Sequence, residues 1–367
     1  MTITPLNHHY ASILTPEQAL LEERDWQELL AASVISAEQL ATHLPIDPEN
    51  VDRVAGAYPM RINPYFLELA CRQGAPLQRQ VVPCIDELLT ADAIPDPLHE
   101  EHQSPVEGII HRYPDRVVFL VSNRCAAYCR FCMRKRRVAT GAPIEWPTLQ
   151  AGIDYIRSAT EVTDVILSGG DPLLRTDTQL EWLLAGLHAI PHVTTIRIHS
   201  RVPSTLPQRI TPALTAILKR FAPLYVNTHF NHAAEVTPQA ETACRRLVEA
   251  GIPLGCQTVL LRGVNDTPAA MQDLMRRLVA IRVKPYYLHQ MDPVAGTAHF
   301  RVPIREGLAI MRSLRGHISG MCVPHYMIDL PGGGGKVPLL PDYVREVRKR
   351  DMVVENFRGE RFTYPLD

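Results

Sequence analysis

Beyond residue 115, short apolar runs alternate with longer segments in which apolar residues recur at every third or fourth position. The short runs are typical of buried strands, and the longer periodic segments are typical of amphipathic helices. This pattern predicts strands at 117–121, 164–168, 195–199, 225–229, 255–261 and 284–289. It predicts helices near 146–158, 178–188, 211–221, 237–250, 267–281 and 304–315.

A regular alternation of strands and helices indicates an α/β fold with a parallel sheet and right-handed crossovers. About six strand–helix units can be traced, which is too few for a closed eight-stranded barrel. We therefore predict a partial (βα)6 TIM-like barrel that is open on one side. Ligands of such barrels bind at the C-terminal ends of the strands, so polar motifs at those ends are candidate site residues.

The chain before the first strand predicts a helical region, because Thr15 and Ser36 each resemble a helix N-cap with Gln three residues later. Repeated prolines divide its later part into short helices and connections. We expect an N-terminal helical region over 1–105, the partial barrel over 106–330 and a C-terminal segment over 331–367.

Composition narrows the class of protein. Of the 367 residues, 46% are hydrophobic and 21% are charged, and the net charge is −1, which is typical of a soluble protein and gives no sign of nucleic-acid binding. No apolar run could span a bilayer, and the N-terminus lacks a signal-peptide pattern. Outside one cluster the eight cysteines stand singly, as is typical of reduced thiols. We expect a cytoplasmic protein without membrane or nucleic-acid partners.

Cys125, Cys129 and Cys132 follow the first predicted strand with the spacing C-x3-C-x2-C. Thiolates this close in sequence can bind three corners of one metal cluster. The sequence that follows supplies neither a fourth cysteine at ferredoxin spacing nor the second ligand pair of a zinc site. The spacing therefore favours a cuboidal iron–sulfur cluster with one iron free of protein ligands. Three buried structural cysteines are the alternative, which the many arginines beside the triplet disfavour.

The second predicted strand ends in Ser168, Gly169, Gly170 and Asp171. Two glycines let the backbone approach a ligand closely, and an aspartate can accept a hydrogen bond from an amine or a hydroxyl. A simple turn is the alternative.

Two motifs could serve a phosphorylated cofactor. Arg112, Tyr113 and Arg116 precede the first strand, where guanidinium groups could bind a phosphate; a solvated strand entrance with a surface ion pair is the alternative. Four glycines precede Lys336, in a pattern that departs from the Walker A motif. A flexible surface hairpin is the ordinary interpretation, but a lysine on a backbone free of side chains also suits a Schiff base with pyridoxal phosphate (PLP).

The cysteine triplet, with Phe131 before its third cysteine, resembles the motif of the radical S-adenosylmethionine (SAM) enzymes. From about residue 60 to near the C-terminus, the sequence resembles the lysine 2,3-aminomutase family. The motifs that carry this resemblance are HRYPDR at 111–116, the triplet with Arg134, SGGD at 168–171, NTHFNH at 227–232, LLRGVND at 260–266 and PGGGGK at 331–336.

The resemblance implies roles for particular residues. Cys125, Cys129 and Cys132 would bind a [4Fe–4S] cluster, and Lys336 would carry PLP as a Schiff base. The implied SAM contacts are Ser168, Gly169, Gly170 and Asp171. Ser200, Arg201 and Gln257, at later strand ends, are the weaker candidates for contacts with SAM. The implied PLP contacts are Arg112, Tyr113 and Arg116. Arg134 would bind the substrate α-carboxylate, and Asp292 and Asp329 would bind its ε-ammonium.

The implied reaction converts L-lysine to L-β-lysine: a 5′-deoxyadenosyl radical from SAM takes a hydrogen atom from the β-carbon, and the amino group migrates on PLP. An electron donor such as flavodoxin or ferredoxin and a homodimer are the expected partners. Two carboxylates around one ammonium select a cationic side chain, which disfavours glutamate but leaves arginine and ornithine open. The supply of β-lysine for modification of elongation factor P is an open alternative for the physiological role. A non-catalytic iron–sulfur scaffold is an open alternative from a different functional class.

Overall fold

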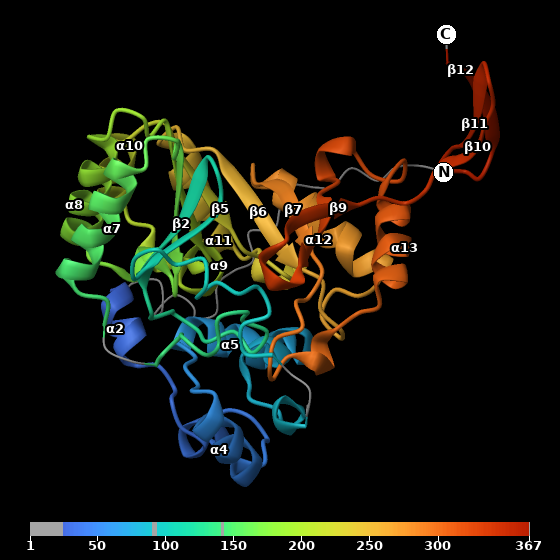
Figure 1. Cartoon of the computed structure of the whole chain (residues 1–367). Coiled ribbons are helices and arrows are strands. Elements are labelled where there is room, and N and C mark those ends of the chain that lie inside the picture. Colours follow the sequence, from blue (N-terminus) through green and yellow to red (C-terminus); the bar gives the residue numbers. More distant parts are fainter. Residues whose placement is uncertain (1–24, 90–93, 141–142, 367) are drawn as a thin grey trace.

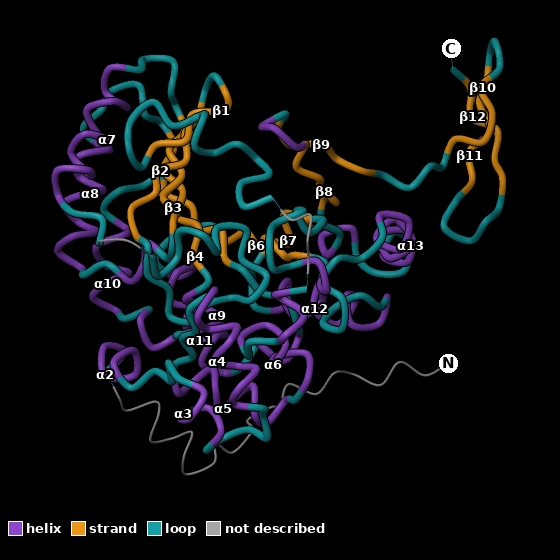
Figure 2. Tube along the Cα trace, turned by 60° about the horizontal axis from the view of Figure 1, so that its bottom comes forward, coloured by secondary structure: helices purple, strands orange, loops and turns teal. Residues whose placement is uncertain are grey.

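The computed structural model describes residues 25–89, 94–140 and 143–366. Its main body is a curved sheet with helices along the outer face, and the helices of the N-terminal region lie against one end of it (Figure 1). A small sheet near the C-terminus projects from this body (Figure 2). The N-cap predicted at Ser36 is confirmed, because its hydroxyl accepts a hydrogen bond from the N–H of Gln39. The one predicted at Thr15 lies outside the described residues.

The strands of the main sheet are adjacent in chain order, from β1 to β9. They are β1 (Ile109–Tyr113), β2 (Arg116–Ser122), β3 (Asp164–Gly169), β4 (Thr195–Ser200), β5 (Leu224–Thr228), β6 (Leu254–Val259), β7 (Lys284–His289), β8 (His325–Leu330) and β9 (Gly335–Leu339). Strands β2 to β8 are parallel, whereas β1 and β9 pair antiparallel with β2 and β8. Among the described residues, six strand–helix units precede β8, which confirms the predicted partial barrel; β1, β8 and β9 are additional to the prediction.

Helices cover the outer face of this sheet. They are α7 (Trp146–Ser158), α8 (Asp177–His188), α10 (Pro212–Lys219), α11 (Pro238–Glu249), α12 (Pro268–Ala280) and α13 (Ile304–Leu314). Shorter turns are α9 (Val202–Thr205), η2 (Pro172–Leu174), η3 (Pro207–Arg209), η4 (Ala233–Glu235), η5 (Ala298–Phe300), η6 (Gly320–Cys322) and η7 (Pro331–Gly333). Thr211, Thr237 and Thr267 cap α10, α11 and α12, each followed by a proline whose missing N–H costs nothing at the first helical position.

Side chains that alternate in direction along each strand face either the core or the lumen of the barrel. In β4, Ile196 and Ile198 are buried in the core that the helices cover. Because successive side chains of a strand point to opposite faces, Arg197 and His199 point the other way, and both line the central cavity.

The N-terminal region packs around an apolar cluster of its own. Its helices are α2 (Trp26–Ala31), α3 (Ala37–Ala41), α4 (Pro48–Ala57), α5 (Pro64–Gln73), α6 (Ala75–Val81) and the 3-10 helix η1 (Ile85–Leu88). The buried Asn63 amide donates to the carbonyls of Ala126, at 3.0 Å, and Thr205, at 2.8 Å. The N–H groups of Tyr128 and Arg130 donate to carbonyls of this region. The region therefore supports the loop that carries the cysteine triplet.

The C-terminal arm is an antiparallel sheet of β10 (Val344–Val347), β11 (Asp351–Glu355) and β12 (Arg361–Pro365). It projects from the body beyond α13 (Figures 1 and 2). No helix in the described part of the chain is both long and apolar enough to cross a membrane.

Candidate active site

The lumen of the partial barrel contains a cavity of about 470 Å³. Every residue that the sequence assigned to the site lines it. These residues are Arg112, Tyr113, Arg116, Cys125, Cys129, Cys132, Arg134, Ser168, Gly169, Gly170, Asp171, Ser200, Gln257, Asp292, Asp329 and Lys336. The cysteine triplet and Lys336, which are far apart in sequence, therefore face the same space.

The cysteine loop follows β2, and its thiols are free. Burial raises the pKa of the Cys132 thiol to about 11 and, together with the nearby Asp171, raises the pKa of Cys125 as well. A raised pKa favours the protonated thiol, and a bound metal cation reverses that preference because it stabilises the thiolate. Among the described residues, no group of three His, Cys, Asp or Glu side chains is placed to hold a single metal ion. Cys125, Cys129 and Cys132 all line the cavity, and three thiols from one short loop are a donor set that an iron–sulfur cluster takes.

Arg201 provides positive charge at this site. Its Nη1 donates to the sulfur of Cys129 at 2.8 Å, and its Nη2 lies 3.1 Å from a carboxylate oxygen of Glu235. Arg201 and Glu235 are both buried, so each compensates the charge of the other.

Gly169, the last residue of β3, and Gly170 make close contacts with protein backbone. The N–H of Gly170 donates to the Ser122 carbonyl at 2.5 Å, and the N–H of Asp171 donates to the Arg124 carbonyl at 2.7 Å. A Cβ on Gly170 would lie 2.4 Å from the Arg124 oxygen, and Gly169 has a φ of +119°. In the structure these glycines let the end of β3 pack against the cysteine loop. Both also line the cavity, and the ligand contact that the sequence suggested for them stays a prediction.

The Asp171 carboxylate is buried and already saturated. It accepts hydrogen bonds from the Ser200 hydroxyl at 2.7 Å and from the N–H groups of Arg201, Leu173 and Val202. Asp171 and Ser200 therefore hold the ends of β3 and β4 together at the cavity wall. Their contact with SAM stays a prediction, as does that of Gln257.

Lys336 is the second residue of β9, and three of the four glycines, Gly332 to Gly334, lie in the turn that joins β8 to β9. The register pairs Asp329 directly with Lys336, so the Lys336 ammonium contacts a carboxylate oxygen of Asp329. The Lys336 N–H donates to the hydroxyl of Tyr113 at 2.8 Å. Arg116 stacks on the Tyr113 ring at 4.2 Å and also makes the surface ion pair with Asp115 that the ordinary interpretation suggested.

The two aspartates lie close enough to influence each other. Burial and then the charge of Asp329 raise the pKa of Asp292 to about 7, while Lys336 and Arg112 oppose that rise. Asp329 is 3.6 Å from Arg112 and 3.8 Å from His289. Its buried Oδ1 has no hydrogen-bond partner among the described residues. Asp329 is thus compensated by Lys336 and Arg112, whereas Asp292 lies buried beside it, so a cationic ligand would favour the charged form of Asp292.

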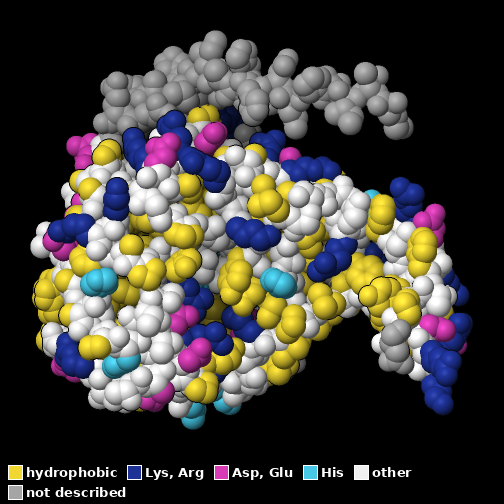
Figure 3. All heavy atoms as spheres, turned by 90° about the horizontal axis from the view of Figure 1, so that it is seen from above, with side chains coloured by type: hydrophobic (Ala, Val, Ile, Leu, Met, Phe, Trp, Pro, Cys, Tyr) yellow, Lys and Arg dark blue, Asp and Glu magenta, His cyan; other side chains and the backbone are white. Residues whose placement is uncertain are grey.

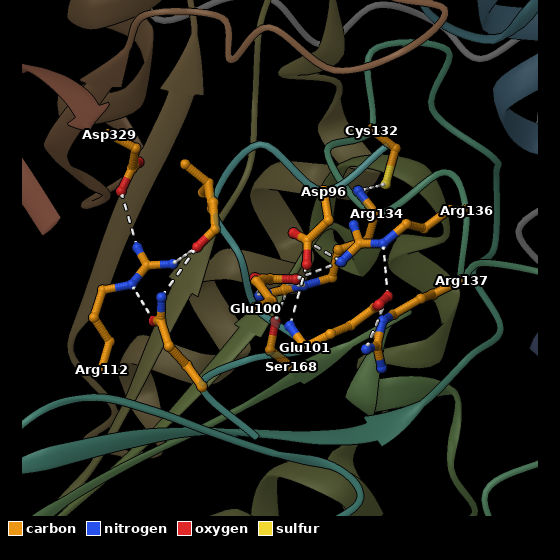
Figure 4. Close-up of polar contacts among 12 residues, drawn as sticks. Asp96, Glu100, Glu101, Arg112, Cys132, Arg134, Arg136, Arg137, Ser168 and Asp329 are labelled. Atoms are coloured by element: carbon orange, nitrogen blue, oxygen red, sulfur yellow. Dashed lines mark hydrogen bonds and ion pairs between the residues drawn. The ribbon is translucent and has the colours of Figure 1, made fainter. Parts of the chain in front are cut away.

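Arg134 makes a contact that the sequence did not predict. Its guanidinium pairs with the buried carboxylate of Glu100, with a shortest distance of 2.8 Å, and its Nη1 donates to the Ser168 hydroxyl at 3.2 Å (Figure 4). Glu100 lies in the segment before β1 and lines the same cavity.

Three cavity histidines are also absent from the sequence prediction. Burial lowers the pKa of His199 to about 3 and that of His229 to about 4, and it lowers the pKa of His289 strongly. All three are therefore neutral near pH 7. Polar residues that alternate with apolar ones inside a strand, as around His199, are the signal that could have revealed them.

Comparisons with known proteins agree with this geometry. A family model described as Radical SAM superfamily matches residues 119–275, and one described as Lysine-2,3-aminomutase matches residues 311–366. The L-lysine 2,3-aminomutase of Acetoanaerobium sticklandii is 45% identical over 347 residues, which cover 93% of this chain and 84% of that protein. The enzyme of the same name from Clostridium subterminale is 45% identical over 349 residues, 93% of this chain and 83% of its own length. The glutamate 2,3-aminomutase of Clostridioides difficile is 40% identical over 331 residues, 88% and 78% of the two chains.

The radical SAM match contains the cysteine triplet and the glycine pair after β3. Membership in that superfamily implies SAM and a [4Fe–4S] cluster as cofactors. The second match contains Asp329 and Lys336. Identity of this degree over most of both chains leaves no doubt about kinship: the chain belongs to the lysine 2,3-aminomutase family of the radical SAM superfamily, as its motifs predicted.

Proposed function

We propose that this protein interconverts L-lysine and L-β-lysine by moving the α-amino group to the β-carbon. The observation that carries the proposal is the single cavity that contains the cysteine triplet, Lys336 and the paired carboxylates of Asp292 and Asp329. The names of the lysine aminomutase relatives point to the same reaction.

The donor sets of the cavity fit the cofactors that this reaction needs. Cys125, Cys129 and Cys132 would hold the [4Fe–4S] cluster, and the ends of β3 and β4 would bind SAM beside it. Lys336 would bind PLP, with Arg112 and Arg116 near its phosphate. When bound, these groups supply a carbon-centred radical that abstracts hydrogen and a conjugated ring that stabilises the substrate radical.

The chain's own residues bind and orient the substrate. Arg134 would bind the α-carboxylate, and Asp292 with Asp329 would bind the distal ammonium. Holding both ends of one amino acid fixes the carbons between them relative to the radical source. Such orientation of the reacting groups lowers the activation barrier. The neutral histidines contribute hydrogen-bonding groups without adding charge, so they would not oppose the attraction of Asp292 and Asp329 for the distal ammonium.

The acid pair also supports lysine over glutamate. A glutamate side chain would bring a third carboxylate into a wall that already raises the pKa of Asp292. A 40%-identical relative is named for glutamate, so overall identity is a weaker guide to the substrate than these two residues.

The test is anaerobic turnover by the protein reconstituted with iron, sulfide, PLP and SAM and then reduced. L-Lysine, L-ornithine, L-arginine and L-glutamate are compared at equal concentration. We expect β-lysine as the main product and no turnover of glutamate. Preferred turnover of arginine or ornithine would reassign the substrate, and turnover of glutamate would refute the role given to Asp292 and Asp329.

Two partners complete the proposal. A one-electron donor such as flavodoxin or ferredoxin would reduce the cluster before SAM is cleaved. A homodimer is supported by the arm, where Val347, Phe362 and Tyr364 are more than half exposed, and Figure 3 shows hydrophobic side chains on its surface. Sedimentation of the full chain tests the dimer, and a monomer at micromolar concentration would contradict it.

A further inference from the structure

Glu100 is a buried acid at the cavity wall, and its carboxylate lies against Arg134. Arg134 Nε donates to its two oxygens at 3.2 and 3.1 Å, and Nη2 donates to Oε1 at 2.8 Å. Only 3% of the Glu100 side chain is exposed. Glu100 therefore occupies one edge of the planar guanidinium, the edge formed by Nε and Nη2 (Figure 4).

The opposite side of Arg134 is held by a second contact. Nη1 donates to the Ser168 hydroxyl at 3.2 Å, and Ser168 lies at the end of β3 in the lumen. A guanidinium carries five N–H groups, so these contacts leave donors on the edge formed by Nη1 and Nη2. That edge can still take a carboxylate in a bidentate manner.

Glu100 is itself fixed by its surroundings. Arg136 lies 3.7 Å from its Oε2 and 2.9 Å from Asp96 on the same segment. The segment over residues 96–103 also contacts the other end of the cavity: the Leu98 carbonyl accepts from Arg112 Nη2 at 3.1 Å, and the Pro97 carbonyl accepts from the N–H of Gly332. One segment thus contacts both the arginine at the carboxylate end and the hairpin that carries Asp329 and Lys336.

We propose that Glu100 is a positioning residue for the substrate carboxylate: it holds one edge of Arg134 so that the remaining edge faces the substrate. This inference rests on the proposed function, in which Arg134 binds the α-carboxylate. Glu100 contributes to substrate affinity and alignment through Arg134 and does not touch the substrate.

If Glu100 positions Arg134, its loss should weaken lysine binding, but its charge alone predicts the opposite effect. Glu100 is an anion close to a site for an anion, so its neutralisation should strengthen lysine binding if long-range electrostatics dominated. Nearby, however, Arg134, Arg136 and Arg137 face Asp96, Glu100 and Glu101, and these charges largely cancel. A glutamine at position 100 would present one oxygen acceptor and one N–H donor, and that donor would face the donors of Arg134. The Arg134 guanidinium would therefore lose its fixed orientation.

The experiment compares Glu100→Gln with Glu101→Gln in the reconstituted, unreduced holoenzyme, where no turnover occurs. Glu101 is the matched control, because it is the next residue and pairs with Arg136 and Arg137, yet its side chain is 57% exposed. Equilibrium dialysis measures binding of L-lysine and of pentane-1,5-diamine, which lacks the carboxylate. KM and kcat for lysine are then measured after reduction.

For Glu100→Gln we expect lysine affinity to fall about 10- to 100-fold, the scale of a misplaced binding group, with KM changed more than kcat and diamine affinity unchanged. Glu101→Gln should change each quantity less than about twofold. Glu100→Asp keeps the charge and should lose less than Glu100→Gln; it also decides the matter if the glutamine variant does not fold. Unchanged or tighter lysine binding, or an equal loss for both ligands, would overturn the proposal.

Arg134→Gln separates this inference from the proposed function. If that variant keeps wild-type lysine affinity, the carboxylate site itself is misassigned. If Arg134→Gln loses the preference for lysine over the diamine while Glu100→Gln retains it, only the role of Glu100 fails.

Discussion

Gly170→Ala tests how the fold places the cysteine loop. A Cβ at this position would lie 2.4, 2.6 and 2.9 Å from the carbonyl oxygen, nitrogen and carbonyl carbon of Arg124. These are backbone atoms, which cannot move away as a flexible side chain could. The end of β3 and the cysteine loop would have to separate by roughly 1 Å to restore ordinary carbon–oxygen contact distances.

That separation has a calculable cost. It would weaken the hydrogen bonds from Gly170 to Ser122 and from Asp171 to Arg124, each worth about 0.5–1.5 kcal/mol. Overpacking adds about 1–3 kcal/mol. We therefore expect the free energy of unfolding to fall by about 2–5 kcal/mol. We also expect less iron to be bound after anaerobic reconstitution, because the displaced loop carries the cysteine thiols.

The assay is urea unfolding followed by circular dichroism, with iron and sulfide analysis of the reconstituted protein. Gly56→Ala is the control, because nothing lies within 4 Å of its added Cβ. Gly56 is the penultimate residue of helix α4, where an alanine should raise the free energy of unfolding by less than about 1 kcal/mol. A Gly170→Ala protein with wild-type stability and full iron content would refute the inference that glycine is required for this backbone contact.

Other residues give further expected outcomes. Glu87→Gln removes the buried partner of Arg130 and Lys135 and should lower the free energy of unfolding in urea by about 3–5 kcal/mol. Glu181→Gln, which breaks the exposed ion pair with Arg220, should lower it by less than about 1 kcal/mol; similar losses for the two variants would contradict the burial argument. Because the pKa of Asp292 is raised to about 7, its charge is lost as the pH falls, so lysine should bind about tenfold more weakly at pH 6 than at pH 8, and a pH-independent dissociation constant would remove Asp292 from the ammonium site. Lys336→Ala should abolish the near-ultraviolet to visible absorbance of a PLP imine, and a band that persists would assign the cofactor to another lysine.

The barrel could be predicted because its helices and strands each carry a complete local signal. The Thr-Pro pairs at Thr211 and Thr237 mark helix starts, and the apolar runs of β3 and β4 bounded by amphipathic helices imply parallel strands. The hairpin strands β8 and β9 carry no such signal: Asp329 and Lys336 lie on either side of a glycine turn, and their pairing depends on the neighbouring β7. The arm strands β10 to β12 are mostly exposed and lack the apolar runs of a buried strand.

The candidate site divides in a similar way. The cysteine triplet and the glycine-flanked lysine could be found from spacing, since each motif is contiguous. Glu100 could not, because its importance arises from a contact with Arg134 across 34 residues of chain. The hydrogen bonds to Asp171 were equally hidden, because its four donors come from the next 3-10 helix, from the end of β4 and from the start of α9.

The central claim is that the cluster site and the PLP lysine act on one substrate within one cavity, and the fate of the substrate nitrogen tests it most directly. The reduced, reconstituted protein is given L-lysine labelled with heavy nitrogen at its α-amino group, and the label is located by nuclear magnetic resonance. We predict that the label appears on the β-carbon of β-lysine. Cleavage of SAM to 5′-deoxyadenosine with the label still on the α-carbon would contradict the account.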